Sequence, residues 1–287
     1  MFQIEKESPL RLPIIEKILK DSRAISLEGF SSSPGEKPKI LSSEHKSGFN
    51  DIVTEYDQKV EDFIVSQLKE KFPGEAILGE ESAYKIKEKP SDETFAKEEL
   101  LWVLDPIDGT ANYSRSYPYF CTTLALLQKI EGRFKVVIGA TLDPVRNEFF
   151  HASLGMGAFL NGEKISVSAA SEFQKALFVT GFAAERHTQK DLVFKRFIEL
   201  TRKSLGVRRT GAAALDLAYI ACGRLDSYWE CGLSAWDVAA GSLLVREAGG
   251  VVSHFERSEE WSTWTGEILA SNKLMHSQVL AELQRIE

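Results

Sequence analysis

The chain has 287 residues, of which 43% are hydrophobic, so it is long enough to bury a full core. Its 35 basic and 42 acidic residues give a net charge of −7, which argues against nucleic acid as a direct ligand, because backbone phosphates need neutralising cations. Three cysteines, Cys121, Cys222 and Cys231, have no C-x-x-C spacing and predict neither a disulfide framework nor a zinc site. The chain shows no secretion signal and no apolar stretch near the ~20 residues that cross a bilayer, so we expect a cytoplasmic protein that is not embedded in a membrane.

Helical spacing of apolar residues predicts two long amphipathic helices, over 10–27 and 54–72. The segment 31–50 between them is rich in Ser, Gly, Lys and Pro and longer than a usual connection, so it is either a functional loop, which we favour, or a poorly ordered linker. The polar stretch 84–99 reads as an exposed excursion. Short apolar runs predict strands of one sheet at 76–78, 100–104, 122–127, 135–142 and 148–152.

After residue 164 the pattern changes to alternating strands and helices, which predicts a layered α/β arrangement. The expected strands are 176–180, 207–209, 226–230, 251–254 and 267–270. The expected helices are 191–204, 212–222, 237–248, which stops at two glycines, and 274–286. We therefore expect one compact unit over 1–287, with an α+β lobe up to about 165 and an α/β lobe from about 166.

Two carboxylates, Asp105 and Asp108, directly follow the apolar run 100–104, so they should emerge together at the end of a buried strand. Carboxylate and carbonyl oxygens are the ligands that hard cations such as Mg²⁺ prefer, and Pro106 restricts the turn that aims them. In isolation, however, such a string is ordinary turn composition.

Two further acids lie at other element boundaries, Glu80 after a short strand and Asp237 at an expected helix start, where it reads as an ordinary N-cap. Together, four carboxylates would carry about four negative charges, which two divalent ions neutralise before a phosphate adds its own charge. The combination therefore favours a two-metal site for phosphoryl transfer.

The strings GEES (79–82), DPIDGTANY (105–113) and WDVAAGSLLVREAGG (236–250) resemble the signature motifs of the inositol monophosphatase family. The strings VTEYDQKVE, RRTGAAALD and LDSYWE resemble it too, so the likeness runs from about residue 46 to the C-terminus. This resemblance implies an α/β/α/β/α sandwich of the sugar phosphatase type. It also implies Mg²⁺-dependent hydrolysis of a small polyol phosphate, inositol 1-phosphate first of all, with inhibition by lithium and a homodimeric state.

Transferred residue by residue, the resemblance implies two Mg²⁺ ions, with Mn²⁺ as a substitute. Glu80, Asp105 and the carbonyl of Ile107 would hold the first ion, and Asp105, Asp108 and Asp237 the second. Glu80 would also serve a weaker third ion.

The resemblance further implies that Glu80 and Thr110 orient a metal-activated water that attacks the phosphorus, and that Asp57 holds the Thr110 hydroxyl. The missing side chain of Gly109 lets the backbone amides of Gly109 and Thr110 approach a phosphate. We count Asp108 with these two residues among the substrate contacts.

For the alcohol half of the substrate, the resemblance places the backbone of Ala213 and the side chain of Glu230 near hydroxyl groups. A carboxylate that accepts bonds from a diol selects polyols over apolar alcohols. Lys46 resembles a lysine of a mobile loop near the metals, and Arg208 and Arg209 could face substrate, a partner subunit or water.

Other chemistries have little support, because the sequence contains no G-x-x-x-x-G-K-[ST], H-E-x-x-H or G-x-S-x-G motif. Histidinol phosphate, fructose 1,6-bisphosphate and a nucleotide 3′-phosphate remain alternative substrates, because the metal motifs do not distinguish them. A moonlighting regulator that binds protein or RNA-associated machinery is the alternative from another class.

Overall fold

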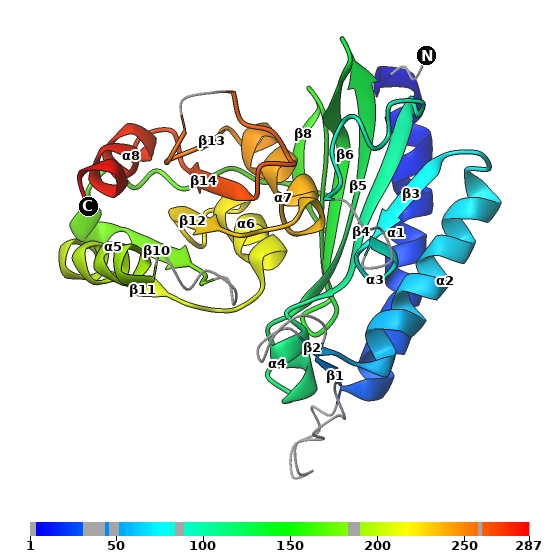
Figure 1. The fold of residues 1–287 in the computed structure, drawn as a ribbon, viewed down its shortest axis with the longest axis horizontal. Coiled ribbons are helices and arrows are strands. Elements are labelled where there is room, and N and C mark those ends of the chain that lie inside the picture. Colours follow the sequence, from blue (N-terminus) through cyan, green and yellow to red (C-terminus); the bar gives the residue numbers. More distant parts are fainter. Residues whose placement is uncertain are drawn as a thin grey trace.

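The computed structural model describes residues 4–30, 44–45, 52–83, 89–182, 190–257 and 260–286. These residues form five layers in the order α/β/α/β/α, as expected: two helices, a seven-stranded sheet, two helices, a five-stranded sheet and two helices (Figure 1). From one side of the molecule to the other, the helices are α1 (Ile4–Gly29) and α2 (Glu55–Lys71), α6 (Ala213–Ala221) and α7 (Ala235–Glu247), and α5 (Lys190–Lys203) and α8 (His276–Arg285). Within the described part of the chain, no helix has the length and apolar character needed to cross a membrane.

The larger sheet contains every strand predicted before residue 165, in the order of the sequence. Its first two strands are parallel and the remaining neighbours are antiparallel. The strands are β3 (Ala76–Gly79), β4 (Leu100–Asp108), β5 (Cys121–Ile130), β6 (Arg133–Asp143), β7 (Glu148–Ser153), β8 (Gly157–Leu160) and β9 (Glu163–Lys164). The last two were not predicted.

The smaller sheet is mixed, with parallel pairing of β10 to both its neighbours and antiparallel pairing across the other edge. In spatial order its strands are β11 (Gly206–Arg208), β10 (Leu177–Thr180), β12 (Ser227–Cys231), β14 (Glu267–Ser271) and β13 (Val251–Ser253). Five short elements lie outside these layers: β1 (Glu44–His45), β2 (Ile52–Val53), α3 (Glu80–Ala83), α4 (Thr110–Ser114) and the 3₁₀ turn η1 (Phe173–Lys175).

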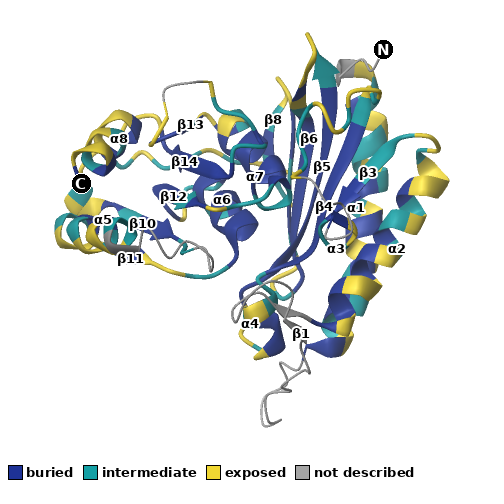
Figure 2. Ribbon diagram, in the orientation of Figure 1, coloured by how far each residue is buried: buried dark blue, intermediate teal, exposed yellow. Residues whose placement is uncertain are grey.

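The middle layer is the most deeply buried, because α6 and α7 are covered by a sheet on each side (Figure 2). Their sequences are apolar nearly all round, as a helix without a solvent face requires. Glycines allow the close approach of these helices to their neighbours. A Cβ atom on Gly241 of α7 would lie 2.5 Å from the Leu217 Cβ of α6, and one on Gly139 of β6 would lie 2.8 Å from the Ala240 carbonyl oxygen.

The outer helix α1 begins earlier than the sequence pattern predicted and contains Pro9 and Pro13. Proline inside a helix removes a backbone hydrogen bond, so local propensity favoured a later start. Contacts of the added turn offset this preference, because Ser8 is buried and Glu7 Oε2 lies 3.3 Å from Arg11 Nη2.

The two polar segments flanking α2 and β3 are only partly described. In the segment 31–50 the structure places 44–45, which pair antiparallel with 52–53, whereas Lys46 lies outside the described residues. In the stretch 84–99 the described part begins at 89 and is not a simple exposed excursion. Asp92 accepts hydrogen bonds from Trp264 Nε1 (2.9 Å) and the Phe134 amide (3.0 Å), and Phe95 stacks on Trp264.

Candidate active site

Acids from distant parts of the sequence meet where β4 ends beside the first turn of α7. Asp105, Asp108 and Asp237 each present a carboxylate oxygen, and these three atoms all lie within 4.8 Å of one another. The pairing of β4 with β5 shifts between Asp105 and Asp108, so the strand is irregular at the Pro106 turn that aims both side chains.

Asp105 is the most constrained of these acids. It is 2% exposed, and its Oδ1 atom has no hydrogen-bond partner among the described residues. Burial raises the pKa of Asp105 well above its usual range, and the nearby carboxylates of Glu80, Asp108 and Asp237 raise it further. A buried, unpartnered carboxylate oxygen among other acids is the environment that a divalent cation neutralises, so this donor set fits a hard metal ion such as Mg²⁺.

Glu80 reaches Asp105 from the start of α3, a short helix that is anchored by a residue the sequence analysis did not single out. Glu61 on α2 is 1% exposed and accepts hydrogen bonds from the backbone amides of Glu81 (2.8 Å) and Ser82 (2.9 Å). It also accepts one from the Ser82 hydroxyl (2.5 Å). Because a Cβ on Gly79 would lie 2.5 Å from the Glu61 carboxylate, the close contact requires glycine there.

The Thr110 hydroxyl is fixed by two acceptors. It lies 2.9 Å from Asp57 Oδ1 and 3.0 Å from the carbonyl oxygen of Ile107. Asp57 is buried in the first turn of α2, where its Oδ2 atom accepts hydrogen bonds from the Thr54 amide (2.8 Å) and hydroxyl (2.6 Å). The capping box of α2 therefore holds Asp57 rigidly, and Asp57 in turn orients Thr110.

Asp108 connects β4 to the beginning of α6. Its Oδ1 accepts a hydrogen bond from the Ala213 amide (3.2 Å) and its Oδ2 one from the Ala214 amide (2.7 Å). Burial raises the pKa of Asp108 to about 7, although the Ala214 amide acts in the opposite direction. The backbone of Ala213, expected near substrate, thus contacts the Asp108 carboxylate in the structure.

Gly109 adopts a left-handed backbone conformation, with φ 93°, immediately before α4. A Cβ atom there would lie 3.1–3.2 Å from Ala212 Cβ and from the carbonyl oxygens of Gly211 and Tyr119. Glycine is therefore required both for the backbone angle and for the close approach of the 210–213 segment.

The expectation that Asp237 is the N-cap of its helix is wrong. Ser234 is the N-cap, and Asp237 is the third helical residue, whose Oδ2 accepts a hydrogen bond from the Ser234 amide (2.6 Å). The helix begins two residues earlier than expected because this capping box encloses Ala235 and Trp236.

Glu230 lies on β12, where Tyr228 donates a 2.6 Å hydrogen bond from its hydroxyl to Glu230 Oε2. Burial raises the pKa of Glu230 to about 7, while the Tyr228 hydrogen bond and the positive charge of Arg209 lower it. Arg209 therefore acts on Glu230 electrostatically, whereas the Arg208 guanidinium lies over Gly206 at the edge strand β11.

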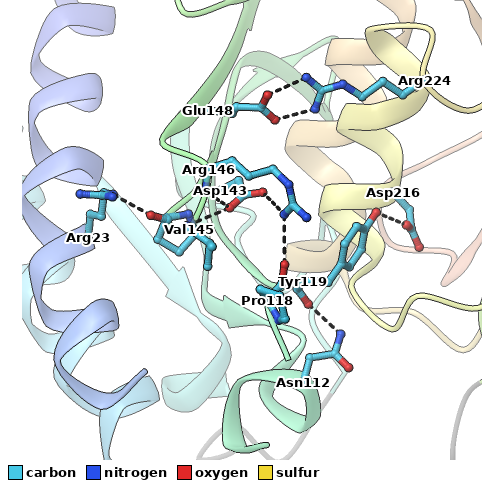
Figure 3. A network of polar contacts seen from close by, with 11 residues as sticks. Arg23, Asn112, Pro118, Tyr119, Asp143, Val145, Arg146, Glu148, Asp216 and Arg224 are labelled. Carbon is cyan, nitrogen blue, oxygen red and sulfur yellow. Dashed lines mark hydrogen bonds and ion pairs between the residues drawn. The ribbon is translucent and has the colours of Figure 1, made fainter. Parts of the chain in front are cut away.

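A polar network, unrecognised in the sequence, holds the segment between β11 and α6 against the larger sheet. Asn112 Nδ2 donates to the carbonyl oxygens of Tyr119 (2.7 Å) and Thr210 (2.8 Å). The hydroxyls of Tyr119 and Thr210 each lie 2.6 Å from Asp216 Oδ1, and Figure 3 shows Tyr119 pointing toward Asp216 on α6. The signal that could have revealed Asp216 is its position as a lone acid in an otherwise apolar helix.

The turn that carries Tyr119 is itself fixed by a second network. Arg146 Nη1 donates to the Pro118 carbonyl oxygen (3.0 Å) and pairs with the buried Asp143 (2.8 Å), as Figure 3 also shows. Burial raises the pKa of Asp216 to about 7, although hydrogen bonds from Thr210 and Tyr119 lower it. The candidate site is thus rigid on the side that faces α6.

Comparison with known proteins identifies the family of the chain. The family model described as "Inositol monophosphatase family" matches residues 16–287. An inositol-1-monophosphatase of Synechocystis is 41% identical over 242 residues, covering 84% of this chain and 79% of the relative. A Nus factor SuhB of Pseudomonas aeruginosa is 40% identical over 251 residues, covering 87% of this chain and 88% of the relative.

Solved structures show the same fold. An IMPase of Thermotoga maritima has a TM-score of 0.81 and 31% identity, covering 96% of this chain and 97% of that one. An inositol monophosphatase of Anabaena has a TM-score of 0.80 and 34% identity, covering 98% of each chain. The chain belongs to the inositol monophosphatase family.

Proposed function

We propose that the chain is a Mg²⁺-dependent phosphatase that hydrolyses the phosphate monoester of a small polyol, with inositol 1-phosphate as the first substrate to test. The observation that carries the proposal is the convergence of Asp105, Asp108 and Asp237, with an unpartnered oxygen on the buried Asp105. Family membership supports the phosphatase chemistry, and the name of the Synechocystis relative supports inositol 1-phosphate.

In this proposal Glu80, Asp105 and the Ile107 carbonyl hold one ion, Asp105, Asp108 and Asp237 hold another, and Glu80 assists a weaker third. Divalent cations at such a site neutralise the phosphate and activate water, which is the chemistry the protein side chains cannot supply alone. Li⁺ would inhibit at the second position, and Mn²⁺ would substitute for Mg²⁺.

The chain's own residues orient the reactants. The Thr110 hydroxyl donates its proton to Asp57, so its oxygen accepts a hydrogen bond from the attacking water in a set direction and positions that water together with Glu80. The backbone amides of Gly109 and Thr110 donate hydrogen bonds to the phosphate, Asp108 would act on it through the ion that it holds, and Asp237 positions the water that protonates the leaving alkoxide. Direct attack by water predicts inversion of configuration at phosphorus.

In this proposal, the side chain of Glu230 and the backbone of Ala213 select the alcohol half of the substrate. Tyr228 occupies Glu230 Oε2, so Glu230 Oε1 is the oxygen that would accept a hydrogen bond from a substrate hydroxyl. Arg209 contributes a positive charge on this side of the site, where it lowers the pKa of both Asp216 and Glu230.

Phosphate release from a panel of substrates at fixed Mg²⁺ tests the proposal. We expect release from inositol 1-phosphate that EDTA abolishes and that exceeds release from histidinol phosphate, fructose 1,6-bisphosphate and a nucleotide 3′-phosphate. Faster release from one of these three would reassign the substrate while leaving the chemistry in place. Release from none of them, with Mg²⁺ present, would contradict the phosphatase assignment.

A regulatory protein-binding role is the second candidate, because several relatives that are 36–40% identical are named Nus factor SuhB. Asp105→Asn separates the two roles. If the variant loses hydrolysis but complements the cellular phenotype of a deletion, the regulatory role accounts for the biology; if it fails to complement, hydrolysis is required. A homodimer is the expected assembly for either role.

A further inference from the structure

A second group of potential metal ligands lies in the five-stranded sheet and consists of residues that the phosphatase proposal does not use. Cys231 is the last residue of β12 and Glu267 the first residue of β14, and the two are directly paired across the antiparallel strands. Glu256, after β13, completes the group, since one ligand atom from each residue lies within 4.8 Å of the others. The three strands lie side by side, far from α1 and α2 (Figure 1).

A buried histidine, whose ring nitrogens have no hydrogen-bond partner among the described residues, lies beside Glu267 of this group. This residue, His254, is 3% exposed. Its Nδ1 lies 4.0 Å from Glu267 Oε1, which is beyond hydrogen-bond distance. Burying a polar ring without partners costs free energy, so an unassigned ligand at this position would account for its retention.

We propose that Cys231, His254, Glu256 and Glu267 form a binding site for a borderline transition-metal ion, with Zn²⁺ as the natural occupant. Zn²⁺ accepts one thiolate, one imidazole and two carboxylates as ligands, whereas Mg²⁺ favours only the carboxylates of this set. Tetrahedral coordination at ~2.0–2.3 Å places ligand atoms about 3.3–3.8 Å apart. The ligand atoms of Cys231, Glu256 and Glu267 already lie within 4.8 Å of one another, whereas His254 is placed only by its 4.0 Å distance to Glu267 and would have to move toward the other two to complete that geometry.

Positive charges near the group determine how the ion binds. Arg196 Nη1 lies 2.8 Å from Glu256 Oε1, and Arg257 Nε lies 3.5 Å from Glu267 Oε2. Each arginine contacts one of its partner's two carboxylate oxygens, and Arg257 is 46% exposed and can turn toward solvent. Since the two arginines already balance the two carboxylates, the ion must displace the Cys231 thiol proton, and its affinity should rise with pH.

Two backbone hydrogen bonds to Glu267 hold its carboxylate in a fixed position. Glu267 is 3% exposed, and its Oε1 accepts hydrogen bonds from the backbone amides of Phe255 (2.6 Å) and Glu256 (2.5 Å). These bonds hold the chain after β13 against the ends of β12 and β14. A bound ion would join the same three strands and would hold the strand that carries Glu230, next to Cys231.

Cobalt substitution tests the proposal without relying on enzyme activity. Co²⁺ bound by a thiolate gives a sulfur-to-metal charge-transfer absorption in the near ultraviolet, which an all-oxygen site cannot give. We expect this absorption in the full chain at one Co²⁺ per chain, its loss in Cys231→Ser, and its displacement by Zn²⁺. Glu256→Gln, a substitution at an exposed position, should weaken Co²⁺ binding by roughly 100-fold or more, because residues that only orient ligands already cost 10–100-fold.

Two matched variants serve as controls. Cys222→Ser removes the thiol at the end of α6, and Cys121→Ser removes the one 3.7 Å from Asp108, where Co²⁺ in the phosphatase site could be confused with the proposed site. Both should keep the absorption. Absence of the band in the full chain, or its persistence in Cys231→Ser, would overturn the proposal.

Discussion

Asp108 accepts a 2.7 Å hydrogen bond from the backbone amide of Ala214, so the carboxylate proposed as a metal ligand also binds the N-terminus of α6. Its other oxygen accepts a hydrogen bond from the Ala213 amide. Asp105, three residues earlier, has an oxygen with no such partner among the described residues. Before any metal binds, Asp108 therefore stabilises the start of α6 through hydrogen bonds, whereas Asp105 keeps an oxygen without a hydrogen-bond partner among the described residues.

This difference predicts opposite effects on stability for the same substitution. In EDTA at pH 8, Asp108→Asn should lower the free energy of unfolding by about 1–3 kcal/mol, because an amide group cannot accept both backbone hydrogen bonds. Asp105→Asn should leave the free energy of unfolding unchanged or raise it, because it removes a repelled, buried charge. Urea denaturation measures both, and equal destabilisation by the two variants would contradict this account.

Mg²⁺ should stabilise the wild-type protein against heat. A ligand that binds only the folded state adds ~2.7 kcal/mol at a hundred times its dissociation constant, and here it also relieves repulsion among the acids. Calorimetry with millimolar Mg²⁺ against EDTA should show a higher Tm. Asp237→Asn provides the comparison, because Mg²⁺ should raise the Tm of this variant much less. A wild-type Tm that does not change when Mg²⁺ is added would contradict the proposed metal site.

The Thr110 hydroxyl should matter for turnover more than for binding. Because Thr110 Oγ1 is held by Asp57 and the Ile107 carbonyl, its hydroxyl points in a fixed direction. Thr110→Val should lower kcat by roughly 10²–10⁴-fold with a small change in KM, as expected for a group that positions or accepts a proton. Thr110→Ser keeps the hydroxyl and should restore most of the rate. Equal losses in both variants would show that packing, and not the hydroxyl, is the cause.

Glu230 should make the metal-free protein less stable as the pH rises. Its pKa is about 7 in the folded protein and near 4.5 when unfolded, so the folded state binds more protons between these values. The contribution of Glu230 to stability is therefore lost from about pH 4.5 to 7 and is constant above that. In Glu230→Gln, the fall in the free energy of unfolding over this range should be smaller than in wild type. Identical pH profiles would contradict the raised pKa.

The elements with strong apolar periodicity were predictable from sequence, and so were the positions of the metal-site acids. The structure confirms a strand at the run 100–104, but the strand continues through Asp105 and Asp108, with a shift in its pairing between them. The start of α7 was predicted less accurately. The predicted start of α7 at Asp237 is two residues late, although Ser234 and Asp237 have the S-x-x-D spacing that is typical of a capping box.

Contacts between distant segments could not be predicted from the sequence, because no local pattern encodes them. Glu61 anchors the Glu80 helix from α2, and Asn112 holds Thr210, which is 98 residues further along the chain. The pairing of Cys231 with Glu267 is likewise a matter of strand register. The cysteine spacing predicted no zinc site, since the proposed partners of Cys231 come from two other segments.

Anomalous scattering from crystals soaked in Mn²⁺ tests the central claim most directly. We expect anomalous density between the carboxylates of Asp105, Asp108 and Asp237, with the Asp105 oxygen that now lacks a partner in contact with the ion. A well-ordered crystal without such density, in which these side chains turn away from one another, would contradict the metal-dependent phosphatase.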